Sequence, residues 1–293
     1  MDIGDRYATR ANSPEETPEP FRSAVLEHLS ARESIEYLAF SPADIRIGVR
    51  SPATLLALTD RRWLVVTDDA DGRAAVAGCA FDDTLLVELT ENLLHCQLKI
   101  DYVAGVTAQS CAIEFAAMSD SVYREAVRLL LRGVGGRSAA SAIGGPAAVP
   151  EIGTRPIIFR NTVPEILAEG GHPIAGVQWS TVYGSYGGEL VPAAALLTTD
   201  RELVLFLEKK VRIHWLRLAS FGYIATFFPL ARLVDFGFRH QERFSILDLE
   251  MHASHGGKKF EVIFPPEQGQ AVAHVVECAR RQPFAAISGK AGT

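Results

Sequence analysis

The sequence predicts a mainly β protein built from two copies of one domain, each a seven-stranded antiparallel barrel or sandwich closed by a C-terminal α-helix. Three observations lead to this prediction: short motifs recur in the same order, apolar residues alternate with polar ones, and small residues separate the two copies. A chain of 293 residues is also long enough for two ordinary domains.

The internal repeat is weak at each point, but its parts keep their order. Residues 55–61, LLALTDR, match residues 195–201, ALLTTDR, at a spacing of 140 residues. Another match lies upstream at a spacing of 138, and a third lies downstream at a spacing of 149. Three matches in one order favour a duplicated domain over chance similarity.

Composition indicates where the two copies meet. Residues 133–154 contain almost no large side chains, which is typical of a flexible linker. The N-terminus is acidic and lacks an apolar run, which is typical of disorder. The expected organisation is a disordered tail at 1–19, domain 1 at 20–134, a flexible linker at 135–159, domain 2 at 160–284 and a disordered tail at 285–293.

Alternation with a period of two predicts the strands of the first copy. The clearest case is Leu94, Cys96, Leu98 and Ile100, which alternate with polar residues. A short helix is expected near 21–29, before the first strand. The expected strands are 34–41, 54–58, 61–67, 74–81, 84–90, 94–101 and 110–116.

Each copy is expected to end in an amphipathic helix that buries its apolar stripe against the open end of the sheet. In the first copy this helix begins at Ser119 or Asp120 and ends at Gly133, and in the second it follows Pro266. The strands of the second copy are expected near 174–183, 193–198, 202–208, 211–227, 230–238, 244–253 and 259–264.

Seven strands and a closing helix resemble the pleckstrin-homology-like (PH-like) arrangement of bacterial proteins. The resemblance rests on residues 55–66, 81–88 and 113–115, where an L-T-x-x-R hairpin is followed by apolar strands. The second copy keeps Thr199-Asp200-Arg201 but departs from the pattern at 228–235. The resemblance covers nearly all of both copies and implies a non-catalytic binding or scaffolding module. It does not indicate what the module binds, because one fold serves many functions.

Charge and cysteine content limit the classes of function. A net charge of −6 argues against nucleic-acid binding, which needs a surplus of Lys and Arg. The charge is uneven, since residues 18–134 carry −6 and residues 155–284 carry +1. The four cysteines form no C-x-x-C pair, and three of them fall in apolar strand patterns and are expected to be core residues, which fits a reducing cytoplasm.

No membrane span, metal site or cofactor site is expected from the sequence. No signal peptide is recognised, and the longest uncharged apolar run, residues 218–231, is shorter than a membrane span. His240, His252 and His255 are interpreted as solvated turn residues rather than a metal site. Catalytic and cofactor-binding motifs were not found.

Two candidate binding regions lie in the second copy. Basic residues at two turns could converge on a phosphate or an anionic membrane surface. These residues are Lys209, Lys210, Arg212, Lys258 and Lys259. An aromatic run without alternation predicts a strand covered on both faces, by the other domain, a partner or a second subunit. The run contains Trp215, Phe221, Tyr223, Phe227 and Phe228.

These patterns favour a non-catalytic protein that acts by binding a protein partner or by self-association. One alternative is peripheral membrane or anionic-ligand binding by the second domain. Another is an enzyme with an unrecognised site between the domains.

Overall fold

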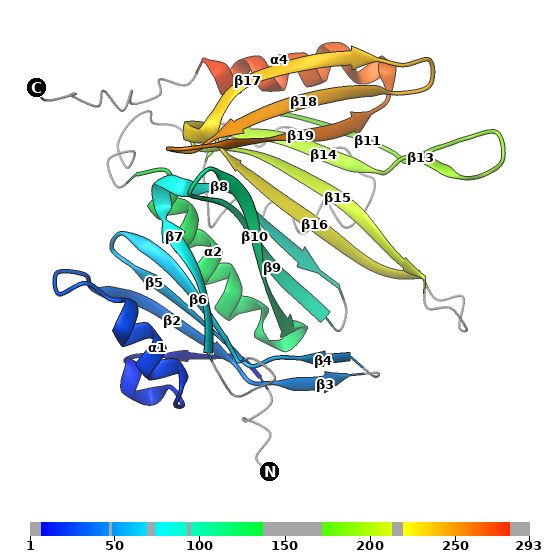
Figure 1. Ribbon diagram of the computed structural model, residues 1–293. Coiled ribbons are helices and arrows are strands. Elements are labelled where there is room, and N and C mark those ends of the chain that lie inside the picture. The colour runs from blue at the N-terminus through cyan, green and yellow to red at the C-terminus, as the bar shows by residue number, and fades with distance from the viewer. Residues whose placement is uncertain are drawn as a thin grey trace, which may run out of the picture.

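The computed structural model describes residues 7–46, 49–68, 74–92, 95–136, 172–212 and 219–281. These residues form antiparallel sheets and three α-helices (Figure 1). The helices are α1 (Phe21–His28) and α2 (Asp120–Val134) in the first half and α4 (Gly269–Arg280) in the second. The mainly β class predicted from the sequence is confirmed.

In the first half, four main strands precede a single-turn 3-10 helix, and three strands and a helix follow it. The four are β2 (Ile35–Ser41), β5 (Thr54–Thr59), β6 (Arg62–Asp68) and β7 (Ala74–Ala80). After η3 (Phe81–Asp83) come β8 (Thr84–Glu91), β9 (His95–Ala104), β10 (Thr107–Ala116), η4 (Ala117–Ser119) and α2. The smaller elements are β1 (Thr9–Ala11), η2 (Pro14–Glu16), β3 (Asp44–Arg46) and β4 (Val49–Ser51).

The second half repeats this order. Its first four main strands are β11 (Pro173–Trp179), β14 (Ala194–Thr199), β15 (Glu202–Arg212) and β16 (Ala219–Pro229). After η6 (Leu230–Arg232) come β17 (Leu233–His240), β18 (Ser245–His252), β19 (Gly257–Phe264), η7 (Pro266–Gln268) and α4. A small hairpin joins β12 (Val182–Tyr183) to β13 (Glu189–Val191).

The two halves also share their strand registers. β2 and β11 each contain a register shift after their first residue, and so do β8 and β17. From η3 and η6 onward, equivalent residues lie 149 positions apart, so that the pair Cys96–Phe115 recurs as Ser245–Phe264. The repeat found in the sequence therefore corresponds to a repeat of strand order and pairing.

The expected strands agree with these bounds to within a few residues, except in two places. The strand predicted at 211–227 is wrong at its start, because β15 continues to Arg212 and β16 begins at Ala219. The strand predicted at 174–183 is divided into β11 and β12. Neither stretch contains a Pro, Asn or Asp that would mark where one strand ends and the next begins.

The strands form open sheets rather than the closed barrel expected in each copy. The main sheets have the orders β1-β2-β5-β6-β7, β10-β9-β8-β16-β15-β14-β11 and β17-β18-β19. β8 pairs with β16 of the other half, so the last three strands of the first half and the first four of the second form one seven-stranded sheet. This pairing joins strands of the two halves, so the described strands do not confirm a separate closed barrel in each copy.

Part of the expected N-terminal disordered tail is ordered. β1 pairs antiparallel with β2, and the backbone N–H of Ala8 donates to Ser119 Oγ at 2.8 Å. These contacts tie residues 8–11 to the sheet and to the start of α2, which explains the error. Most of the expected linker and the last twelve residues lie outside the described residues.

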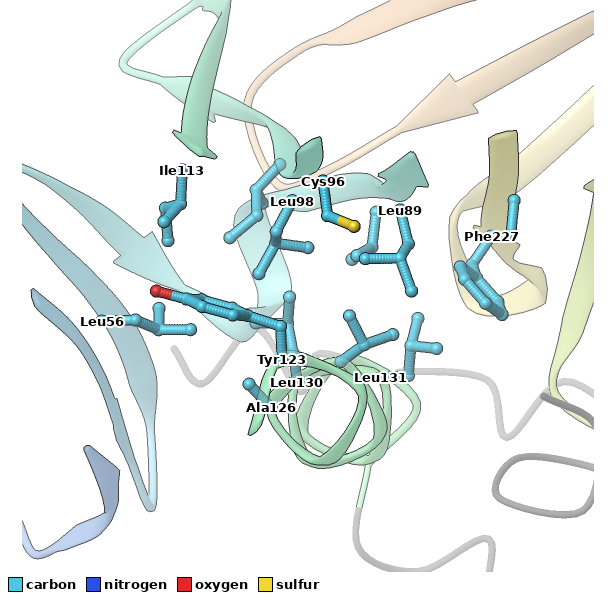
Figure 2. Close-up of a cluster of buried hydrophobic side chains, with 14 of the residues drawn as sticks. Leu56, Leu89, Cys96, Leu98, Ile113, Tyr123, Ala126, Leu130, Leu131 and Phe227 are labelled. Carbon is cyan, nitrogen blue, oxygen red and sulfur yellow. The ribbon is translucent and has the colours of Figure 1, made fainter. Parts of the chain in front are cut away.

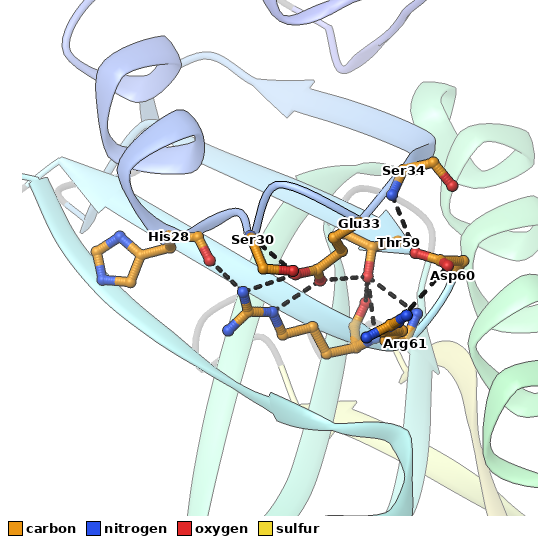
Figure 3. A network of polar contacts seen from close by, with 8 residues as sticks. His28, Ser30, Glu33, Ser34, Thr59, Asp60 and Arg61 are labelled. Atoms are coloured by element: carbon orange, nitrogen blue, oxygen red, sulfur yellow. Dashed lines mark hydrogen bonds and ion pairs between the residues drawn. The ribbon is translucent and has the colours of Figure 1, made fainter.

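The Thr-Asp-Arg sequence forms the same turn in both halves, as expected from tight-turn chemistry. Thr59 Oγ accepts from the backbone N–H of Arg61, and Thr199 Oγ accepts from that of Arg201, both at 3.1 Å. In the first half Glu33 adds a carboxylate that binds both Thr59 and the side chain of Arg62 (Figure 3).

Two of the three apolar core clusters contain residues of both halves. The cluster under α2 includes Leu89 and Leu131 of the first half and Phe227 of the second (Figure 2). The cluster under α4 includes Leu85 and Leu86 of the first half. The third cluster lies under α1. Burial of apolar surface thus joins the two halves as well as stabilising each one.

Candidate interaction site

The aromatic residues of β16 lie at the junction between the halves. Tyr223 stands opposite Glu91 of β8, and Phe227 stands opposite Val87. Tyr223 and Phe227 are 5 % exposed and face the core under α2, whereas Phe228 is 2 % exposed and belongs to the core under α4. Both faces of the strand are therefore covered within one chain.

The remaining members of the aromatic run are less fully described. Phe221 lies in β16 opposite Lys210, but its side chain is outside the described part of the structure. Trp215 also falls outside the described residues.

A glycine permits the close approach of β16 and β8. A Cβ atom at Gly222 would lie 2.5 Å from the backbone oxygen of Glu91. Real Cβ atoms do not come so close to backbone oxygens, so a side chain at this position would push the two strands apart. The strand pairing across the halves consequently depends on Gly222.

A largely buried ion pair reinforces this pairing. Arg124 of α2 donates to both carboxylate oxygens of Glu91, at 3.1 and 2.9 Å, and to Tyr223 Oη at 3.3 Å. Its Nε also lies 3.2 Å from Asp120 Oδ2. One guanidinium thereby connects the C-terminal helix of the first half, the end of β8 and a residue of the second half.

Two further ion pairs cross between the halves. Lys258 Nζ of β19 lies 2.8 Å from Oδ2 of Asp101, whose side chain is fully buried, and Lys99 lies 3.5 Å from Oδ1 of the same carboxylate. Arg232 Nη2 lies 2.8 Å from Asp82 Oδ1. Buried charges require such partners, so these pairs fix how the halves sit against each other.

The candidate basic residues do not converge on one site. Lys209 lies opposite Gly222, close to the Glu91 end of β8, whereas Lys258 binds Asp101 near the other end. The spacing of residues in a strand puts these two places roughly 16 Å apart. A single phosphate cannot bridge that distance.

The other basic candidates are either paired or only partly described. Lys259 Nζ lies 3.7 Å from Glu250 Oε2. Lys210 and Arg212 belong to β15, but their side chains are outside the described part of the structure. The structure therefore brings Lys258 to a carboxylate rather than to the other lysines.

The outer edge of β17 is the surface that differs most from its counterpart in the first half. β17 is the equivalent of β8, but it lies at the edge of its sheet, and no described strand pairs with its outer side. Every residue of β8 except Glu88 is buried, whereas no residue of β17 is, and Val234 is 64 % exposed. In Figure 1, β17 runs along the upper edge of the molecule with α4 behind it.

The edge of β17 carries both apolar and charged side chains. Phe236 and Phe238 are half-buried against the core under α4, and their ring centroids lie 6.0 Å apart. Asp235 and Arg239 are exposed. The sequence analysis missed these residues, although the symmetric order Asp-Phe-Gly-Phe-Arg at 235–239 was available as a signal.

Buried cysteine thiols and one solvent-open cavity are the remaining candidates for a reactive site among the described residues. Burial raises the pKa of the Cys79 thiol to about 12 and that of Cys111 to about 11, so these thiols stay protonated at neutral pH. No cluster of three potential metal ligands occurs among the described residues. A cavity of about 410 Å³ beside Trp179, Thr181 and Glu267 is open to solvent and contains no cluster of ionisable groups.

Comparisons with known proteins add no assignment. No protein-family model matches the sequence, and no curated protein matches it either. Within the described ranges, no helix is long and apolar enough to cross a membrane.

Proposed function

We propose that this is a non-catalytic binding or scaffolding protein, built from two PH-like halves, that recognises an extended strand of a protein partner at the edge of β17. The repeated element order and register support the PH-like arrangement. Free cysteines suit the cytoplasmic location that the proposal includes.

One observation carries the proposal: the same sheet edge is filled in one half and open in the other. β8 of the first half accepts β16 as an antiparallel neighbour, and its side chains are buried in the cores under α2 and α4. β17 occupies the equivalent position in the second half and has the same register shift, but no described strand pairs with its outer edge. An open sheet edge with apolar side chains is a template for strand addition.

The test is whether binding depends on the β17 edge. Val234→Lys places a charge on this exposed edge, which opposes strand addition. Val106→Lys is the matched control, because Val106 is 82 % exposed and lies in the turn between β9 and β10. The immobilised native chain and Val106→Lys are expected to retain the same proteins from a lysate, and Val234→Lys is expected to lose them.

Two results would overturn the proposal. One is retention of the same proteins by Val234→Lys, which would place the binding surface elsewhere. The other is an absence of protein association together with salt-sensitive binding to anionic vesicles, which would favour the alternative of an anionic ligand.

A further inference from the structure

We infer that the strand recognised by β17 is β17 of a second copy of the chain, and that the two strands pair antiparallel about a two-fold axis at Gly237. This inference rests on the proposed function and names its partner. The seven-stranded sheet at the junction shows the kind of contact involved, since β8 and β16 already pair in this way.

The sequence of β17 is complementary to itself in the antiparallel direction. With Gly237 opposite Gly237 of the second copy, Phe236 stands opposite Phe238 and Asp235 stands opposite Arg239. Each such pair occurs twice because of the symmetry. Facing aromatic and opposite-charge pairs are the contacts that stabilise neighbouring antiparallel strands.

The two faces of the strand separate these contacts. Phe236 and Phe238 lie on the side of the core under α4, where two more rings would extend an aromatic cluster that already includes Phe264, 6.2 Å from Phe238. Asp235 and Arg239 are exposed. Gly237 leaves open space, since nothing lies within 4 Å of a Cβ built at that position.

Arg239 and Asp235 each have one hydrogen-bonding atom that no described residue uses. Asp248 binds Arg239 through Nε and Nη2, at 2.6 and 2.7 Å, and Glu261 binds Nη2 at 2.6 Å. Among the described residues, nothing accepts a hydrogen bond from Nη1 of Arg239. Asp235 uses Oδ1 to accept from the backbone N–H of Phe236 at 2.9 Å, which leaves Oδ2 for the arginine of a second copy.

Cysteine cross-linking tests the register directly. In antiparallel pairs, opposite Cα atoms are about 4.5–5.5 Å apart, which is within the range of a disulfide. Gly237→Cys is therefore expected to give a covalent dimer under mild oxidation. Asp235→Cys is the matched control on the same face. It stands opposite residue 239, so the two new thiols lie too far apart to join.

Mass measurement by light scattering over a range of concentrations tests the association itself. The native chain is expected to form dimers as concentration rises. Asp235→Arg places an arginine opposite Arg239 of the second copy, and the two-fold symmetry repeats this repulsive contact. We therefore expect the dissociation constant of the dimer to rise about tenfold. Asp235→Asn is expected to have a smaller effect in the same direction.

The outcomes separate this inference from the proposed function. A native chain that stays monomeric at every concentration, or equal cross-linking by both cysteine variants, would overturn the self-pairing. If the native chain nevertheless retains a partner protein that Val234→Lys does not retain, the proposed function stands. The strand that pairs with β17 then belongs to that protein and not to a second copy of the chain.

Discussion

The two halves have the same strand order and register, but they treat the same sheet edge differently. In the first half β16 covers β8, and Leu85 is fully buried. In the second half the equivalent position, Val234, is 64 % exposed on a strand that no described strand covers on its outer side. The difference teaches that one fold can use a sheet edge to join its own repeats and leave the equivalent edge of the second repeat without a described neighbouring strand.

The largest expected effect comes from placing one substitution at the two equivalent positions. Leu85→Lys puts a charge into a packed core and is expected to lower the free energy of unfolding by roughly 4 kcal/mol or more. Val234→Lys is expected to change it by less than about 0.5 kcal/mol. Urea denaturation of both variants measures the difference. Equal effects would show that the two edges are not as different as their burial indicates.

The carboxylates beside the two Thr-Asp-Arg turns are expected to respond oppositely to pH. Hydrogen bonding to Arg62 lowers the pKa of Glu33 to about 2, whereas burial raises the pKa of Glu202 to about 7. Glu202 is therefore expected to stabilise the fold fully below about pH 4.5 and to lose that contribution as the pH rises through about 7. Glu33 contributes above about pH 4.5 and loses its contribution as the pH falls towards about 2.

Glutamine variants separate the two contributions. The native chain is expected to lose stability on the order of 3 kcal/mol between about pH 4.5 and about pH 8 because Glu202 titrates. Glu202→Gln is expected to show no such loss. Glu33→Gln is expected to leave that loss in place. Denaturation curves at several pH values measure it. An unchanged pH profile in Glu202→Gln would mean that this carboxyl is not the group that titrates.

A smaller effect is expected where the halves are joined by charge. Lys258→Met leaves the buried carboxylate of Asp101 with only the more distant Lys99, and we expect a loss of about 1–3 kcal/mol. Lys259→Met is the control, because this side chain is 73 % exposed and its ion pair is expected to contribute at most about 1 kcal/mol. Thermal or urea unfolding compares them, and equal losses would contradict the role given to Lys258.

The sequence is enough to predict the individual strands but not which strands pair. Alternation at Leu94, Cys96 and Leu98 places a strand because neighbouring side chains point to opposite faces. Pairing between β8 and β16 joins residues about 135 positions apart, such as Glu91 and Tyr223 at 132, and leaves no local pattern. The lack of alternation in the aromatic run indicated two covered faces, but it did not say what covers them.

The candidate site was harder to predict for the same reason. Lys258 carries a charge that sequence patterns assign to a solvated turn, whereas in the fold it lies beside the buried Asp101 of the other half. The sequence of β17 has a symmetric order at 235–239, but only a comparison with the covered β8 reveals that the edge of β17 is open. Exposure of an edge is a property of the whole sheet rather than of the residues in one strand.

The central claim is that the edge of β8 is closed within the chain and the edge of β17 is closed only by another chain. Amide hydrogen exchange measures this most directly, because it reports the pairing of each strand separately. We expect slow exchange in β8 at every protein concentration, and exchange in β17 that slows as concentration rises. Equally slow exchange in both strands in dilute solution, or exchange in β8 as fast as in β17, would contradict the account.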